Sequence, residues 1–286
     1  RGLGDVYKRQ GKSNYVAAIV AGCICPAGAE VDTLGIQITA NGRHKAVLLY
    51  DTEQSEVQLF KNVGNLLARA KQPDKPDELK AFCLTGMSRK ERLNAIVQSM
   101  DKFYYQYGGI QLVVIDGIAD LVKSANDEAE SVAVIDELYR LAGIYNTCIL
   151  CVLHFVPNGL KLRGHLGSEL QRKAATILSI EKDEEPAQSV VKALKVRDGS
   201  PLDVPLMLFA WDKEAGMHVY KGEKPREEKE KRKERELVNV ARDIFGRQTR
   251  ITYIDLCEQL QQVLDIKERT AKSYIRFMRE RDIITK

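Results

Sequence analysis

Three short apolar runs, separated by longer amphipathic stretches, constrain the fold of this chain more than any other feature. The runs are Ala46–Tyr50, Gln111–Ile115 and Cys148–Leu153. Apolar runs of this length are typical of parallel strands that are buried on both sides. The intervening stretches have the apolar spacing of helices and lie around residues 54–70, 89–105 and 128–145. This alternation predicts an α/β fold, a mostly parallel sheet with helices on both faces.

The pattern changes after residue 163. Short runs separated by Gly, Pro and Asp then predict added strands or hairpins at one sheet edge, at Ile177–Glu181, Val190–Val196 and Leu206–Trp211. Residues 221–236 have almost no apolar side chain and are expected to be a solvated linker, helical in part. We therefore expect one domain over residues 11–220, a charged linker over 221–236 and a second unit over 237–286.

Composition excludes several classes of protein. With 286 residues, 44% of them hydrophobic, the chain has enough apolar side chains for a packed core. No apolar run approaches the roughly 18 residues that a membrane span needs. The six cysteines lie mostly in apolar contexts, which favours reduced thiols and a cytoplasmic protein. Cys148 and Cys151 form a C-x-x-C pair, but residues three apart on a strand point to opposite faces, so we do not expect a metal or redox site there.

Gly11-Lys12-Ser13 matches the last three residues of the phosphate-binding loop G-x-x-x-x-G-K-[ST]. In that loop, backbone N–H groups surround the phosphates, the lysine reaches the outer phosphates and the hydroxyl holds Mg²⁺. The first glycine of the pattern is missing, because Val6 occupies its place. A chance match is the alternative interpretation, since G-K-S alone is a weak signal.

Residues 1–10 contain no apolar run for the buried strand that should precede such a loop. They resemble the translated read-through of a sequencing adapter, so we expect them to be foreign and the true N-terminal part of the protein to be missing. On this interpretation the chain as given binds ATP poorly and is impaired, whereas its full-length parent hydrolyses ATP.

Two acids follow buried strands, where α/β folds bind their ligands. Asp116 ends the run Leu112–Ile115 and is a candidate for the Mg²⁺ shell. Glu53 follows Ala46–Tyr50 and could orient and deprotonate a water that attacks the γ-phosphate. Capping of the next helix is the alternative for Asp51 and Glu53.

The order of these motifs resembles that of RecA-like P-loop ATPases. G-K-S, then YDTE at 50–53, LVVIDG at 112–117 and VLH at 152–154 follow the order of hexameric helicases of the RepA and DnaB type, AAA family ATPases of mobile elements. Further downstream, LRGHLGSE at 162–169 resembles the helicase segment L-R-x-S-G-x-x-E. KVRDG at 195–199 resembles the K-x-R-x-G hairpin. The resemblance spans about residues 11–212.

The resemblance implies a role for each matching residue. Gly11, Lys12 and Ser13 would bind the ATP phosphates, with Ser13 and Asp116 at the Mg²⁺ ion. Glu53 would activate water. His154 would sense the γ-phosphate, although Phe155 stands where the family often has a second histidine or a glutamine. Lys195 and Arg197 would reach into a neighbouring subunit's ATP site and stabilise transition-state charge there, which requires a ring or filament. Two solvated cations on a hairpin are the alternative.

The C-terminal unit carries the excess of positive charge. Residues 221–286 hold 18 Lys and Arg against 13 Asp and Glu, which suggests contact with nucleic acid. Residues 251–264 and 267–281 are expected to form two helices of a winged helix or helix-turn-helix unit. The apolar side of the second helix would pack inward and its basic side would enter DNA, with these candidate DNA-binding residues: Arg269, Thr270, Lys272, Ser273, Arg276 and Arg279. A solvated helix or a protein-interaction module is the alternative.

These features predict an ATP-dependent DNA helicase or DNA-remodelling ATPase that replicates or mobilises a plasmid or mobile element. Its cofactors would be ATP and Mg²⁺, and its partners would be DNA and further copies of itself in a ring, which the resemblance implies is a hexamer. The alternative is a DNA-binding regulator, or a recombination or partition ATPase, in which ATP controls assembly without unwinding.

Overall fold

The structure is a computed structural model that describes residues 10–154, 164–183, 188–224, 229–246, 248 and 250–285. The adapter-like residues 1–9 lie outside this part of the chain, as do Phe155, Leu162 and Arg163 of the expected motifs. The chain divides into two compact units, Arg1–Lys224 and Pro225–Lys286, which are described separately below.

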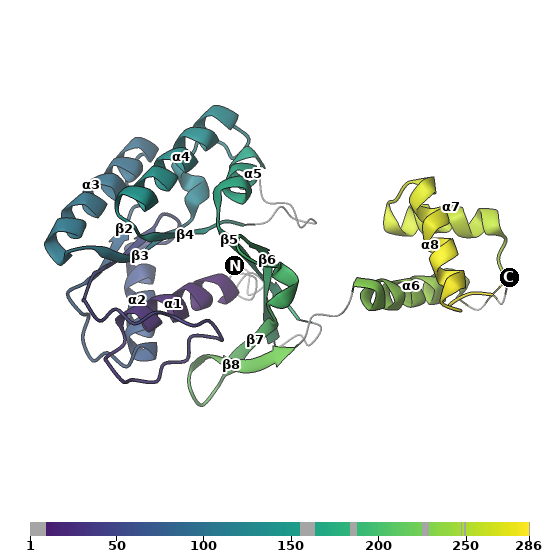
Figure 1. The fold of residues 1–286 in the computed structure, drawn as a ribbon, viewed down its shortest axis with the longest axis horizontal. Helices are drawn as coiled ribbons and strands as arrows, with labels where there is room; N and C mark the ends of the chain where they lie inside the picture. Colours follow the sequence, from purple (N-terminus) through teal and green to yellow (C-terminus); the bar gives the residue numbers. More distant parts are fainter. Residues whose placement is uncertain are drawn as a thin grey trace. The chain divides into compact units, whose positions relative to one another are not determined.

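A four-stranded parallel sheet forms the centre of the first unit (Figure 1). Its strands lie in the order β2-β1-β3-β4. Their bounds are Ala46–Asp51 for β1, Leu79–Cys83 for β2, Ile110–Asp116 for β3 and Cys148–Val152 for β4. The three expected strands are confirmed. Strand β2 was not expected, because its sequence LKAFC contains a lysine and only Leu79 is buried.

Helices cover both faces of this sheet, as the sequence predicted. Helices α1 and α2 pack with Val47 and Leu49 in one cluster, whereas α3 and α4 pack with Leu48 and Tyr50 in another. Neighbouring residues of β1 therefore point to opposite faces and both faces are buried. The helices span Gln10–Ile24 (α1), Glu56–Arg69 (α2), Arg89–Tyr107 (α3) and Glu128–Ile144 (α4).

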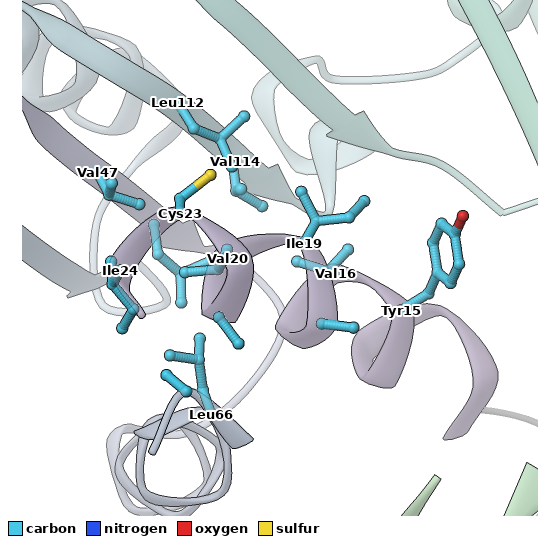
Figure 2. Packing of buried hydrophobic residues seen from close by; sticks show 14 of the residues in the cluster. Tyr15, Val16, Ile19, Val20, Cys23, Ile24, Val47, Leu66, Leu112 and Val114 are labelled. Atoms are coloured by element: carbon cyan, nitrogen blue, oxygen red, sulfur yellow. The ribbon is translucent and has the colours of Figure 1, made fainter. Parts of the chain in front are cut away.

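Helix α1 is the innermost helix of the unit. Its sequence from residue 15 to 24 is almost wholly apolar, which is typical of a helix that is buried all round. Figure 2 shows Ile19, Val20 and Cys23 of α1 near Val47 and Val114 of the sheet. The first turn of this helix thereby takes a fixed position relative to the ends of the strands.

A second sheet follows in the sequence. It is antiparallel, in the order β5-β6-β7-β8, and belongs to the same core because Val191, Met207 and Phe209 cluster with α1. Its strands span Thr176–Lys182 (β5), Gln188–Val196 (β6), Leu206–Asp212 (β7) and Met217–Lys224 (β8). The short helical elements of this unit are η1 (Ile118–Leu121), α5 (Gly164–Lys173) and η2 (Pro201–Asp203).

Strand β8 differs from the expectation for this region. A linker was expected from residue 221, but β8 continues to Lys224 because its backbone pairs with β7 from Leu206 to Asp212. The linker expected over 221–236 is also shorter at its other end, since helix α6 begins at Lys229. Glu, Lys and Arg are good helix formers, which explains why the charged residues from Lys229 onward belong to helix α6.

The second unit consists of three helices in its described residues. They span Lys229–Phe245 (α6), Tyr253–Leu264 (α7) and Glu268–Glu280 (α8). Leu237 of α6, Leu260 of α7 and Ile275 of α8 are buried together in one core. The two helices expected around the turn at residues 265–266 are present, but the described residues of this unit contain no strand that could form a wing. None of the described helices in either unit is long and apolar enough to cross a membrane.

Candidate functional site

Strands β1 and β3 end side by side, and each ends in an acid. The parallel register pairs Asp51 with Asp116. Asp51 is 2% exposed, and its Oδ1 accepts hydrogen bonds from the backbone N–H groups of Glu53 at 3.0 Å and Gln54 at 2.8 Å. Asp51 thus shapes the turn that presents Glu53. The cap of the following helix α2 is Ser55, whose side chain accepts from the Gln58 N–H.

Thr52 joins the two strand ends and was not singled out by the sequence. It is 3% exposed, and its Oγ1 lies 2.8 Å from the Gly117 carbonyl oxygen and 3.2 Å from Asp120 Oδ2. Its backbone N–H also donates to the Asp116 carbonyl at 3.1 Å. These contacts hold the residue that precedes Glu53 against the loop that follows Asp116.

Gly117 is required by this close approach. Its φ is +98°, and a Cβ at this position would lie 2.3 Å from Thr52 Oγ1 and 2.6 Å from Glu53 Cγ. Side chains rarely adopt such a backbone conformation, and no Cβ fits at these distances. The absence of a side chain at position 117 therefore leaves room for Glu53.

Lys12, His154 and Glu53 converge from three different elements. Lys12 lies in the first turn of α1, and its Nζ is 2.9 Å from His154 Nδ1, just beyond β4. His154 Nε2 is 3.6 Å from Glu53 Oε2. If the ammonium of Lys12 donates to Nδ1, the imidazole proton lies on Nε2 and faces the carboxylate. The arrangement is a chain of polar groups from lysine through histidine to glutamate.

Asp116 lies in a strongly charged environment. Burial, together with the carboxylates of Asp51 and Glu53, raises the pKa of Asp116 from an ordinary value near 3.8 to about 6, while Lys12 acts in the opposite direction. Burial lowers the pKa of Lys12, against the influence of Glu53 and Asp116. The carboxylates outnumber the cations here, so a further positive charge would be stabilised.

These residues fit a Mg²⁺ ion that arrives with a phosphate. The described residues contain no group of three His, Cys, Asp or Glu side chains that would hold a metal alone. Mg²⁺ commonly binds through one or two carboxylates together with substrate phosphates and water, so such a group is not needed. Asp116 supplies a carboxylate with a raised pKa, and Ser13 lies beside Lys12 in the first turn of α1.

Gly11 has a packing role in this structure. A Cβ there would lie 3.1 Å from Ile180 Cγ2 of β5, so the first turn of α1 fits closely against the second sheet. Helix α1 spans Gln10–Ile24, so the G-K-S motif lies in its first turn, as a phosphate-binding loop requires.

Lys195 and Arg197 lie at the end of β6, and their side chains contact backbone carbonyl groups of α5. Lys195 Nζ donates to the Gln171 carbonyl at 2.7 Å, and Arg197 Nη2 donates to the Lys173 carbonyl at 3.1 Å. Both cations thus satisfy carbonyl groups at the C-terminal end of a helix. The structure brings together Lys12, Glu53, Asp116 and His154 but does not add these two residues to them.

The candidate DNA-binding residues lie on α8. Ala271, Ile275 and Met278 are buried, so the apolar side of the helix packs inward as predicted. Thr270 is half-buried, and the remaining candidates are exposed: Arg269, Lys272, Ser273, Arg276 and Arg279. Part of the positive charge is compensated within the helix, because Lys272 pairs with Glu268 at 2.7 Å and Arg276 with Glu280 at 2.8 Å.

Comparison with known proteins identifies one family. The family model described as an AAA domain matches residues 8–158, just over half of the chain. The match includes Lys12, Glu53, Asp116 and His154 and ends before Lys195. No curated protein matches the chain.

Proposed function

Because the chain belongs to the AAA domain family, we propose that it is an ATPase whose catalytic site lies where Lys12, Glu53 and His154 converge. This convergence is the observation that carries the proposal, because the three residues are far apart in the sequence. They also differ in chemistry: a cation for phosphate, a carboxylate for water and an imidazole between them.

Lys12 would bind the outer phosphates of ATP. Its ammonium contacts His154 in this structure, and a phosphate oxygen is a stronger partner because it carries negative charge. When Lys12 turns to the phosphate, His154 Nδ1 loses its donor and can accept or donate a hydrogen bond elsewhere. His154 would therefore respond to the presence of the γ-phosphate.

Glu53 would position and deprotonate the attacking water. Its side chain is 38% exposed, and the turn fixed by Asp51 and Thr52 holds its backbone in place. A Mg²⁺ ion held by Ser13 and Asp116 would neutralise the phosphate charge that develops during the reaction.

For the substrate on which this ATPase acts, we propose DNA, and for its assembly a ring of identical subunits in the cytoplasm. The order of the motifs up to Arg197 and the exposed basic side of α8 support a helicase of the RepA and DnaB type, acting in the replication or mobilisation of a plasmid or mobile element. A strand-displacement assay tests this activity. ATP hydrolysis without strand displacement would favour the regulator or partition ATPase.

The substitution Glu53→Gln, made in the full-length parent expected from the sequence, tests the catalytic site. We expect ATP hydrolysis to fall by about 100-fold or more, because the amide cannot accept the proton of water, while ATP binding is retained. Single-turnover hydrolysis and equilibrium binding of labelled ATP measure the two effects. The control is Glu56→Gln, an exposed acid in the first turn of α2, which should change neither. Undiminished hydrolysis by Glu53→Gln would exclude the role of this residue.

A further inference from the structure

A polar pocket lies on the first unit, apart from the residues assigned to ATP. It encloses about 480 Å³ between the start of α3, η1 and the loop that follows η1. None of Lys12, Glu53, Asp116 and His154 lines it. Its polar lining residues are Ser88, Arg89, Arg92, Asp120, Lys123, Ser124 and Asn126.

Three cations and one acid line this pocket, and the acid has partners of its own. Asp120 Oδ2 lies 3.9 Å from Arg92 Nη1 and 3.2 Å from Thr52 Oγ1. Asp120 and Arg92 therefore offset each other. Arg89 and Lys123 remain, both exposed, and neither side chain has an ion pair within the described part of the chain.

The wall around Arg92 is rigid. The Nε of Arg92 donates to the carbonyls of Leu84 and Met87, both at 3.0 Å, and its Nη1 donates to the Asp120 carbonyl at 3.2 Å. With a further bond to the Thr85 carbonyl, this side chain is held in a single orientation. A guanidinium has five N–H groups, so donors are left over for a ligand.

The opposite wall is also fixed. The Leu166 N–H of α5 donates to the Ala125 carbonyl at 3.0 Å, and the Glu130 carboxylate accepts from the Lys123 backbone N–H. Gly164 approaches Ala125 so closely that a Cβ there would lie 2.3 Å from the Ala125 oxygen. The loop that carries Lys123 and Asn126 is thus anchored to α4 and α5.

From this geometry we propose that the pocket is a second oxyanion site, which binds a phosphate group by means of Arg89, Arg92 and Lys123. Its cations are supplemented by neutral donors, the hydroxyls of Ser88 and Ser124 and the amide of Asn126. Such a mixture suits the several oxygen atoms of a phosphate. The same chemistry is offered by free phosphate compounds and by the phosphodiester groups of a nucleic acid strand, which the test below distinguishes. If the ligand is a nucleic acid strand, this proposal rests on the proposed function; if the ligand is a free phosphate compound, it does not.

The test uses the full chain carrying Lys12→Gln, so that phosphate binding at the proposed ATP site does not contribute. Two probes are titrated separately: inorganic pyrophosphate, by calorimetry, and a fluorescein-labelled oligothymidylate, by anisotropy. The pocket variant adds Arg89→Gln and Lys123→Gln. The matched control adds Lys61→Gln and Lys102→Gln instead, which removes two exposed lysines outside the pocket and changes the net charge equally.

We expect the pocket variant to bind at least one probe about tenfold more weakly than the control, because two charge-assisted contacts are lost. A loss for pyrophosphate alone supports a site for free phosphate compounds, and a loss that includes the oligothymidylate supports a site for strand phosphates. Equal affinities of the pocket variant and the control for both probes would overturn the proposal. Because ATP hydrolysis is not measured, failure of the ATPase proposal does not affect this result.

Discussion

At the scale of single residues, Asp116 shows how burial and neighbouring charges act on one carboxylate of the proposed site. Its carboxylate lies beside Asp51 and Glu53, and its pKa is raised to about 6. A carboxylate whose pKa is raised by folding stabilises the fold while it is protonated, and this contribution is lost as the pH rises through the folded pKa. At neutral pH the ionised carboxylate of Asp116 therefore lowers the stability of the fold, and a bound cation would offset this loss.

The substitution Asp116→Asn should reveal this cost. At pH 7–8 we expect the free energy of unfolding to rise by about 2–3 kcal/mol, because the ionised carboxylate is removed, and the gain should vanish near pH 4. Denaturant unfolding across this pH range measures the effect, with the exposed loop variant Asp74→Asn as the control. Binding of ATP with Mg²⁺ should weaken in the same variant. A gain in stability that does not depend on pH would contradict this account.

Gly117 matters because its neighbours occupy the space of a side chain. In Gly117→Ala the methyl group would meet Thr52 Oγ1 and Glu53 Cγ, and a φ of +98° is unfavourable for alanine. We expect a loss of about 1–3 kcal/mol in stability and slower ATP hydrolysis, because Glu53 is displaced. Thermal unfolding and single-turnover hydrolysis measure these changes. Gly86→Ala is the control, since that glycine has open space and no positive φ; equal effects of the two substitutions would refute the explanation.

At the scale of elements, helix α2 is tied to both the segment before β1 and strand β8 by one buried cation. Arg69 is 5% exposed, and its guanidinium donates to the Asp32 carbonyl at 2.9 Å and the His218 carbonyl at 2.5 Å. The Asp32 carboxylate in turn accepts from the Tyr220 N–H at 2.8 Å. Residues from three distant parts of the sequence thereby satisfy one another.

We expect Arg69→Met to lower the free energy of unfolding by about 3 kcal/mol, because one buried and one partly buried carbonyl group lose their donor. Denaturant unfolding of the full chain measures the loss. The control is Lys61→Met, the same replacement of a cation on the exposed side of α2. If the two variants are equally stable, the ties to Asp32 and His218 contribute nothing measurable.

At the scale of the whole molecule, the ring proposal makes Lys195 and Arg197 act on another subunit. In a single chain both residues contact carbonyl groups at the end of α5, and the residues assigned to ATP lie elsewhere. A second copy of the chain would have to receive them. Their contacts with α5 of the same chain can hold both side chains in place before such an assembly forms.

Mixing two inactive variants tests this arrangement. Under the proposal, Arg197→Ala lacks the residue that would reach a neighbour's ATP site, whereas Glu53→Gln lacks the residue that would activate water. We expect each variant alone to be inactive, and the mixture to regain part of the ATP hydrolysis, because some interfaces combine an intact Glu53 with an intact Arg197. Steady-state hydrolysis against mixing ratio is the measurement. A mixture no more active than its components would exclude action between subunits.

The local patterns of the sequence determined much of the first unit. Apolar runs identified β1, β3 and β4, and helical spacing identified the helices between them, because each of these patterns repeats over neighbouring residues. Strands β2 and β8 were missed because they lack such a repeating local pattern. Their residues are mixed in character, and they become strands by pairing with β1 and β7. The sequence also predicted Lys12, Glu53, Asp116 and His154 as site residues from the order of the motifs.

The tertiary structure alone decided which side chains meet. Three features depend on residues that are far apart in the sequence. They are the contact of Lys12 with His154, the position of Thr52 against Gly117 and the raised pKa of Asp116. The pocket beside Arg89 and Lys123 likewise arises from two separate segments, the start of α3 and the chain from η1 to Asn126. A sequence determines local periodicity and the kinds of chemistry available, whereas distance, burial and the charge around a group depend on strand register and helix packing, which no local pattern contains.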